Sequence, residues 1–128
     1  MINKGIGVVN AVPHLASAIG SSPRILIYQQ DGDLVLYKVS GDSPTAEWSA
    51  NTGGRKPGRV AMQDDGNFVI YGPDNKVHWA LWKEMPRGYE GSYIAIDNIN
   101  GKLAYHKNGN SKEAFYINDK KDCYLAPQ

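Results

Sequence analysis

An internal repeat of 34 residues is the feature that most constrains how this chain folds. The segment QQDGDLVLY, from Gln29 to Tyr37, is matched by QDDGNFVIY, from Gln63 to Tyr71, and a further 34 positions lead to Tyr105. A repeat of this length indicates several copies of one small unit that bury a shared core. We therefore expect residues 1–128 to form a single domain. Its repeats span about 20–53, 54–87 and 88–121.

The pattern inside each copy favours strands over helices. No extended window shows the apolar period of 3.6 residues that marks a helix, and residues 14–19 hold one helical turn at most. β-Branched and aromatic residues instead gather in short segments between turn signals such as Asp65-Gly66. These segments are 24–28, 34–39, 59–62, 68–71, 93–96 and 102–106. The chain is therefore predicted to be all-β, with each repeat forming a small antiparallel sheet.

Large aromatic residues predict where the sheets meet. Trp48, Trp79 and Phe115 each follow the tyrosine of their own repeat at a similar distance. Such side chains bury a large apolar area, so we expect these three to lie at a common axis.

The second copy predicts a polar face on a hairpin. If Asp64-Asp65-Gly66 is a three-residue loop, Gly66 takes the left-handed conformation that such loops need, and Gln63 pairs with Asn67. Strand alternation then adds Val69 and Tyr71 to the same outward face, beside Asp65. The residues expected to point into the core are Met62, Phe68 and Ile70.

The other two copies fit this geometry to different degrees. The first places its polar face at Gln29, Asp31, Asp33, Val35 and Tyr37, with Leu34 and Leu36 turned inward. In the third copy we expect Asn100-Gly101 to form a two-residue turn that changes the strand register. There Asp97, Ile99 and Gly101 replace the polar residues, and only Leu103 and Tyr105 survive. The third copy is expected to keep the scaffold and to lose the site.

The spacing Gln-x-Asp-x-Asn-x-Val-x-Tyr resembles the sugar-binding signature of the bulb-type, snowdrop-agglutinin-like mannose-binding lectins. It is complete at Gln63, Asp65, Asn67, Val69 and Tyr71, and the first copy has one change, Asp33 for asparagine. The resemblance covers residues from about 20 to 118. It implies a β-prism II fold, in which three four-stranded antiparallel sheets surround a pseudo-threefold axis.

The resemblance also implies roles for these residues. In that family the glutamine, aspartate, asparagine and tyrosine bond to mannose hydroxyls, and the valine packs on the sugar ring. Asp33 removes an amide donor and sets a second carboxylate near Asp31, so we expect the first site to be weaker. A homodimer is compatible with the resemblance. The C-terminal segment 112–128 is longer than in the family, however, so strand exchange between subunits is not assumed.

Composition excludes several classes of protein. The 14 Lys and Arg nearly balance the 13 Asp and Glu, so the chain lacks the positive field of a nucleic-acid binder. No stretch approaches the roughly 20 apolar residues that would insert into a membrane. Cys123 is the only cysteine, and His14, His78 and His106 are not at metal-ligand spacing. We therefore expect neither a metal nor another cofactor.

An enzyme is not expected either. The pairs Asp31/Asp33 and Asp64/Asp65 resemble the two carboxylates of a glycoside hydrolase. They fall at exposed loop tips, however, without the pocket that would raise the pKa of one of them.

The sequence thus predicts a non-catalytic lectin that recognises mannose or mannose-containing glycans. The alternative is a protein-interaction or toxin-like module on the same scaffold with vestigial sugar sites, and a β-trefoil lectin is a third idea. Trp82 is either a platform for a second sugar or, as we favour, a filler between repeats. Residues 1–20 are interpreted as an opening strand and loop, so we expect a cytoplasmic protein or one exported without a classical signal peptide.

Overall fold

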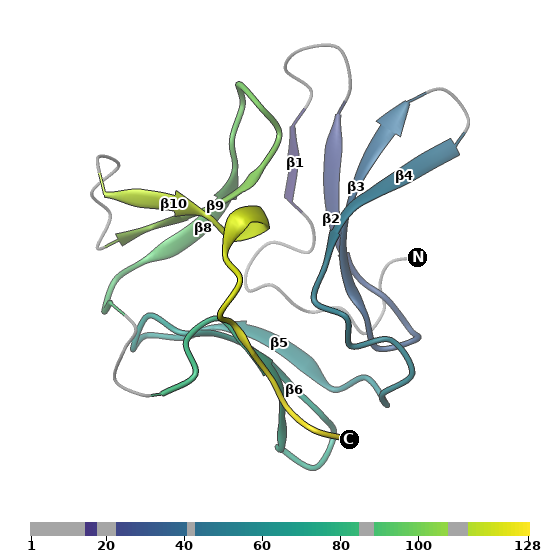
Figure 1. The fold of residues 1–128 in the computed structure, drawn as a ribbon, viewed down its shortest axis with the longest axis vertical. Helices are drawn as coiled ribbons and strands as arrows, with labels where there is room; N and C mark the ends of the chain where they lie inside the picture. Colours follow the sequence, from purple (N-terminus) through teal and green to yellow (C-terminus); the bar gives the residue numbers. More distant parts are fainter. Residues whose placement is uncertain (1–14, 18–22, 41–42, 85–88, 108–112) are drawn as a thin grey trace.

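The fold consists of three antiparallel sheets around a common core (Figure 1). The computed structural model describes residues 15–17, 23–40, 43–84, 89–107 and 113–128. The short 3-10 helix η2 (Ile117–Asp119) accompanies the strands. The sheets follow one another along the chain, as the three repeats predict.

The first sheet has four strands in the order β1-β2-β3-β4. They are β1 (Leu15–Ser17), β2 (Arg24–Tyr28), β3 (Leu34–Ser40) and β4 (Ser43–Ser49). Residues 15–17 pair with β2 as a strand, so the helical turn allowed for residues 14–19 is not found in the described part of that segment. The rest of the predicted opening strand and loop lies outside the described residues.

The second sheet recruits the end of the chain. Its order is β11-β7-β6-β5. The strands are β5 (Arg59–Met62), β6 (Phe68–Tyr71), β7 (Val77–Ala80) and β11 (Tyr124–Leu125). In β11, Tyr124 pairs with Ala80 and Leu125 with Trp79. The long C-terminal segment therefore completes a sheet of its own chain.

The third sheet has three strands among the described residues, in the order β10-β9-β8. They are β8 (Tyr93–Ile96), β9 (Leu103–His106) and β10 (Ala114–Tyr116). Ile117, in η2 directly after β10, is fully buried.

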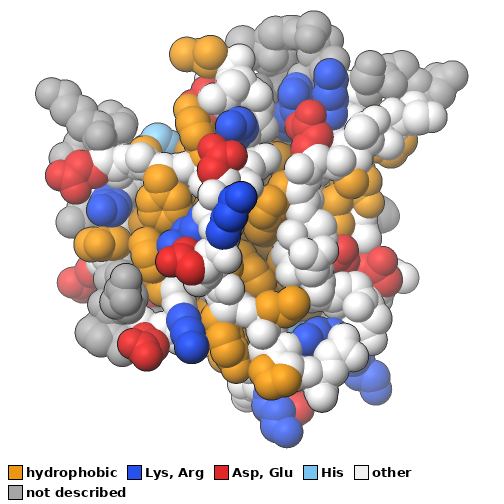
Figure 2. All heavy atoms as spheres, viewed as in Figure 1, with side chains coloured by type: hydrophobic (Ala, Val, Ile, Leu, Met, Phe, Trp, Pro, Cys, Tyr) orange, Lys and Arg blue, Asp and Glu red, His pale blue; other side chains and the backbone are white. Residues whose placement is uncertain are grey.

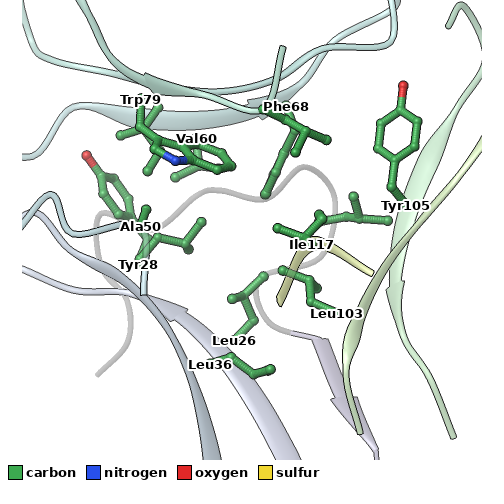
Figure 3. Close-up of a cluster of buried hydrophobic side chains, with 14 of the residues drawn as sticks. Leu26, Tyr28, Leu36, Ala50, Val60, Phe68, Trp79, Leu103, Tyr105 and Ile117 are labelled. Atoms are coloured by element: carbon green, nitrogen blue, oxygen red, sulfur yellow. The ribbon is translucent and has the colours of Figure 1, made fainter. Parts of the chain in front are cut away.

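One hydrophobic core joins the three sheets. Leu26 and Leu36 reach it from the first sheet, Phe68 and Trp79 from the second, and Leu103 from the third (Figure 3). All five are at most 3% exposed. Side chains from every repeat thus share a single interior, in which burial of apolar area stabilises the fold.

The predicted axis residues differ in how deeply they are buried. Trp79 is 3% exposed and meets Trp48 edge-on at 5.8 Å between ring centroids. Trp48 and Phe115 are partly buried and pack against the core from its rim. The inward side chains expected for the second hairpin are confirmed, because Phe68 and Ile70 are fully buried. Met62 packs against them.

The third hairpin departs from its prediction. Asp97 pairs with Lys102 through an N–H···O bond of 2.8 Å, so the loop has four residues, 98–101, and the expected two-residue turn is wrong. The Asp97 carboxylate accepts bonds from the backbone N–H groups of Ile99 (2.7 Å) and Asn100 (3.3 Å). This local capping favours the wider loop over the tight turn that Asn100-Gly101 indicates.

The longer loop reverses the faces of β9. Leu103 pairs with Ile96 and Tyr105 with Ile94, and both Leu103 and Tyr105 are fully buried. The expectation that these two residues survive on the outer face is therefore wrong. The physical reason is that a shift of one residue in register moves every side chain of a strand to the opposite face.

Candidate functional site

The second hairpin turns as predicted, through a three-residue loop that ends in glycine. Gln63 N–H donates to the Asn67 carbonyl at 2.9 Å, and Gly66 N–H donates to the Gln63 carbonyl at 2.9 Å. Gly66 has φ +91°, in the left-handed region that favours glycine. A Cβ atom there would lie 2.2 Å from backbone atoms of Tyr89, so the bend also fits closely against the third repeat.

Three side chains of this hairpin form a chain of hydrogen bonds. The Tyr71 hydroxyl donates to Gln63 Oε1, and Gln63 Nε2 donates to the two Asp65 carboxylate oxygens at 3.1 and 3.2 Å. Asp65 also accepts from the Asn67 backbone N–H at 2.9 Å. Because each group orients the next, the phenol, amide and carboxylate are held in fixed positions before any ligand arrives.

Asn67 links the hairpin to the segment that follows β7. Its Oδ1 accepts from the backbone N–H groups of Trp82 (2.9 Å) and Phe68 (3.0 Å), while its Nδ2 donates to the Trp82 carbonyl at 3.0 Å. Asn67 is therefore only 3% exposed, and Val69 only 2%. The prediction of an open, solvent-facing patch is wrong for these two side chains, because the following segment covers them.

The five motif residues nevertheless line one hollow of about 230 Å³. Its walls are completed by β7, by the segment after it and by β11, through Val77, Ala80, Trp82, Lys83 and Tyr124. Pockets for drug-sized ligands begin at roughly 300 Å³, so this hollow suits a smaller molecule. The sequence could not identify Tyr124 as a wall residue, because β11 pairs with β7 from more than 40 positions away.

The lining chemistry suits an uncharged, hydroxyl-rich ligand. Asp65 is the only acidic side chain that lines the hollow and can accept hydrogen bonds, while Gln63 and Tyr71 can donate or accept. Val69 and Ala80 offer a small apolar surface. The Arg59 guanidinium lies 4.1 Å from the centroid of the Tyr71 ring and steadies that ring from outside the hollow.

The first hairpin repeats the same network. Gly32 has φ +93°, and Gln29 N–H donates to the Asp33 carbonyl at 2.8 Å. Tyr37 donates to Gln29 Oε1, and Gln29 Nε2 donates to Asp31 at 3.1 and 3.2 Å. Burial first, and then the negative charges of Asp31 and Asp33, raise the pKa of Tyr37. The phenol therefore keeps its proton, and its donor role, at neutral pH.

Asp33, which stands in the first hairpin where the motif has asparagine, accepts hydrogen bonds from neighbouring residues. Ser49 Oγ lies 2.8 Å from both carboxylate oxygens, and the Thr52 backbone N–H donates to Oδ1 at 3.1 Å. Ser49 pairs with Val35, in the place where Ala80 pairs with Val69 in the second sheet. A serine hydroxyl thus compensates for the amide that the substitution removed. The repulsion expected between the Asp33 and Asp31 carboxylates is offset by this added hydrogen-bond donor.

The third hairpin presents different chemistry. Asp97 stands where Gln63 stands in the second copy, and it accepts a bond of 2.8 Å from the hydroxyl of Tyr116, on the neighbouring strand β10. The backbone N–H of Ile99 and the Tyr116 hydroxyl lower the pKa of Asp97. Outside this pair, Tyr93 stacks on His106 with 4.7 Å between ring centroids.

Trp82 fills the gap between the second and third repeats, as favoured from the sequence. It is 8% exposed, and its ring meets those of Tyr89, Tyr105 and Phe115 edge-on at 5.6 Å in each case. Its backbone holds Asn67 in place. Trp82 therefore couples the candidate site to the packing of the third repeat.

The described residues contain neither a metal-binding cluster nor a membrane-spanning helix. No cluster of three or more His, Cys, Asp or Glu in those ranges is placed to hold a metal ion. None of the helices described there has the length and apolar character to cross a membrane.

Burial raises the pKa of the Cys123 thiol to about 11, so this cysteine is a weak nucleophile at neutral pH.

Comparison with known proteins points to one group. No family model matches the chain. Over 52 residues it is 46% identical to the mannose-specific lectin of Narcissus pseudonarcissus, a match that covers 40% of this chain and 44% of that protein. The mannose-specific lectin of Galanthus nivalis is also 46% identical over 52 residues, 31% of its own length. The match thus spans less than half the length of these curated relatives.

A solved structure extends the likeness to most of the fold. The native mannose-specific bulb lectin of Scilla campanulata superposes with a TM-score of 0.58 at 21% identity, covering 82% of this chain and 87% of that one. The predicted class is therefore confirmed, and the chain has the all-β, β-prism II fold. The resemblance to the bulb-type mannose-binding lectin family is confirmed as well, in fold and over the matched sequence.

Proposed function

We propose that the chain is a non-catalytic lectin that binds mannose or mannose-containing glycans. The observation that carries this proposal is the convergence of all five motif residues of the second hairpin on one hollow. The names of its relatives, mannose-specific lectins, support the choice of sugar.

The mode of binding follows from the side chains of the hollow. A neutral pyranose offers hydroxyl groups and C–H surfaces. The Asp65 carboxylate accepts from sugar hydroxyls, Gln63 and Tyr71 complete the polar set, and Val69 packs against the ring. Because Tyr71, Gln63 and Asp65 already bond to one another, little ordering accompanies binding.

A purely binding role fits the charges of the hollow. Glycoside hydrolysis uses two carboxyl groups that flank the scissile bond. Asp65 is the only carboxylate that lines this hollow, and its partners are a glutamine amide and a backbone N–H. The mechanism is therefore recognition by hydrogen bonding and apolar contact.

We further propose that the first hairpin, through Gln29, Asp31, Asp33, Val35 and Tyr37, forms a second and weaker site. Each net hydrogen bond contributes about 1 kcal/mol, so a shallow site with a few of them binds a monosaccharide at roughly millimolar concentration. Two such sites on one chain raise the avidity for a branched glycan well above that of either site.

A titration with methyl α-mannoside, followed by calorimetry or ligand-observed NMR, tests the proposal. In Tyr71→Phe the lost hydroxyl releases Gln63, and we expect mannoside binding to the second hairpin to weaken about fivefold or more. The matched variant Tyr37→Phe makes the same change in the first hairpin and should have the smaller effect. Methyl α-glucoside, which differs at one hydroxyl, is the control ligand.

Two results would overturn the proposal. One is a parent protein that binds neither mannoside nor mannan. The other is a parent whose affinity is unchanged in Tyr71→Phe and Tyr37→Phe together. A protein partner that free mannose does not displace would favour the protein-interaction module instead.

A further inference from the structure

A second hollow adjoins the candidate sugar site at the end of the second sheet. It measures about 530 Å³, and its walls come from residues 54–56, from the turn and strand 74–78 and from the C-terminal segment. Val77 and Tyr124 line both hollows. The two hollows are therefore neighbours that share these two wall residues.

The second hollow is basic. Arg55, Lys56 and Lys76 line it, against a single acidic side chain, Asp74. In Figure 2, Lys and Arg side chains also lie at the lower end of the visible face, where Figure 1 places the C-terminus. The lining of the sugar site is instead balanced in charge, with one acidic side chain, Asp65, and one basic side chain, Lys83. The two hollows thus offer different chemistry to one extended ligand.

Two buried polar atoms beside the basic hollow lack a partner among the described residues. They are Arg55 Nε and His78 Nδ1. Arg55 is held in place by the bond from its Nη2 to the Ala126 carbonyl at 2.5 Å, but its Nε–H is left without an acceptor. An unpaired buried donor is costly. A guanidinium that lines the hollow and is anchored in one position is suited to an anionic oxygen ligand.

From the shared wall, the basic lining and this anchored guanidinium, we infer that the second hollow binds an acidic substituent on a glycan whose mannose occupies the site of the second hairpin. The substituent is a phosphate, sulfate or carboxylate on the adjoining sugar residue. The inference deepens the proposed function and rests on it. It makes this lectin selective for acidic over neutral mannose glycans.

The test compares a neutral mannobioside with the same disaccharide carrying a 6-phosphate on its second residue, titrated by calorimetry at low salt. We expect the phosphorylated ligand to bind about fivefold more tightly, a gain typical of a partly exposed charge pair. The preference should fall in 0.5 M NaCl, because salt screens such pairs over roughly 10 Å at 0.1 M and over shorter distances above it. Sulfated and uronic-acid disaccharides, as further arms, identify which acid is preferred.

Variants that remove positive charges show where the acidic group binds. Lys56→Gln/Lys76→Gln removes two charges from the basic hollow without touching the sugar site, and it should abolish the preference while neutral binding stays unchanged. Lys38→Gln/Lys121→Gln makes the same change in net charge outside this hollow and should keep the preference. Arg55→Gln provides a third variant, with its fold checked by circular dichroism because Arg55 also holds Ala126.

The outcomes separate the two proposals. If the neutral disaccharide binds and the phosphorylated one binds no more tightly, the inference is overturned and the proposed function stands. A preference that survives Lys56→Gln/Lys76→Gln also overturns it, because the acid is then bound elsewhere. If neither disaccharide binds, the proposed function fails, and the inference fails with it.

Discussion

The second and third hairpins occupy equivalent places in the repeat, yet residues 34 positions apart on β6 and β9 face opposite ways. Tyr71 lines the hollow of the candidate site, whereas Tyr105, 34 positions later, is fully buried. The difference arises from one additional loop residue, since residues 98–101 replace the three-residue bend at 64–66. Loop length, more than the strand sequence, thus decides which copy of this repeat can form a site.

The two hairpins also differ in which strand supplies the tyrosine that contacts the residue before the bend. In the second hairpin the phenol that reaches the Gln63 position comes from β6, as Tyr71. In the third, Tyr116 of β10 reaches Asp97 from the neighbouring strand. A tyrosine hydroxyl therefore meets the residue before the bend in both copies. In the second copy, this tyrosine lines a hollow together with the other motif residues.

The largest expected effect is on the free energy of unfolding, and it distinguishes the buried Tyr105 from Tyr71, which lines the hollow. Tyr105→Ala removes a fully buried ring that stacks on Phe115 at 5.1 Å, and it should cost about 3–5 kcal/mol in the free energy of unfolding. Tyr71→Ala, at a half-buried position, should cost about 1 kcal/mol and act mainly on sugar binding. Urea denaturation of both variants checks this, and equal losses would contradict the contrast.

The bend of the second hairpin gives the next largest effect. Gly66→Ala combines a left-handed φ with a Cβ only 2.2 Å from the backbone of Tyr89, and we expect a loss of about 3 kcal/mol. Gly54 is the matched control, because its φ is also +91° but no atom lies within 4 Å of the added Cβ. Gly54→Ala should cost about 1 kcal/mol. Similar melting temperatures for the two variants would rule out the close contact.

A smaller effect tests the comparison between the first and second hairpins. Asn67→Asp turns a carboxylate oxygen toward the Trp82 carbonyl and should destabilise the protein by about 2 kcal/mol. Adding Ala80→Ser places a hydroxyl beside the new carboxylate, as Ser49 does beside Asp33. This second change should restore about 1 kcal/mol of the free energy of unfolding. A double-mutant cycle by chemical denaturation measures this coupling, and strictly additive losses would show that Ser49 is not the compensating donor.

The smallest effect concerns the titration of Asp97 in the third hairpin. Its pKa is lowered by the Ile99 N–H and by the Tyr116 hydroxyl, so the stabilisation exists above the unfolded pKa and is lost as pH falls through the folded one. We expect Tyr116→Phe to raise the pKa of Asp97 toward its ordinary value of about 3.9. NMR titration of the carboxyl carbon measures this shift. An unchanged titration would mean that Tyr116 does not stabilise the carboxylate.

Much of the fold can be predicted from the sequence because local signals agree with the tertiary structure. The predicted segments, which carry β-branched and aromatic runs, match β2, β3, β5, β6, β8 and β9 nearly to the residue, and the glycine bends at Gly32 and Gly66 are also as predicted. Strand β7 was not among the predicted segments. The exposed strand β4, which contains Pro44 and Glu47, lacks this signal. β11 is two residues long and is ordered by pairing with β7.

The five motif residues line one hollow, as their spacing predicts, but the burial of Asn67 and Val69 was not predicted. The motif spacing identifies Gln63, Asp65 and Tyr71, which hydrogen-bond to one another within the hairpin. The cover over Asn67 comes from the backbone of Trp82, 15 residues later, and no local pattern encodes that contact. In the third hairpin, the dipeptide Asn100-Gly101 indicates a tight turn, but capping by Asp97 prevails.

A titration of isotope-labelled protein with methyl α-mannoside, followed by backbone and side-chain amide NMR, tests the central claim most directly. The account predicts the largest shift changes at the amides of Gln63, Asp65 and Asn67, smaller ones around Gln29 and Asp33, and none along residues 102–106. Saturable changes confined to the third hairpin, or no changes at concentrations well above the millimolar range, would contradict it.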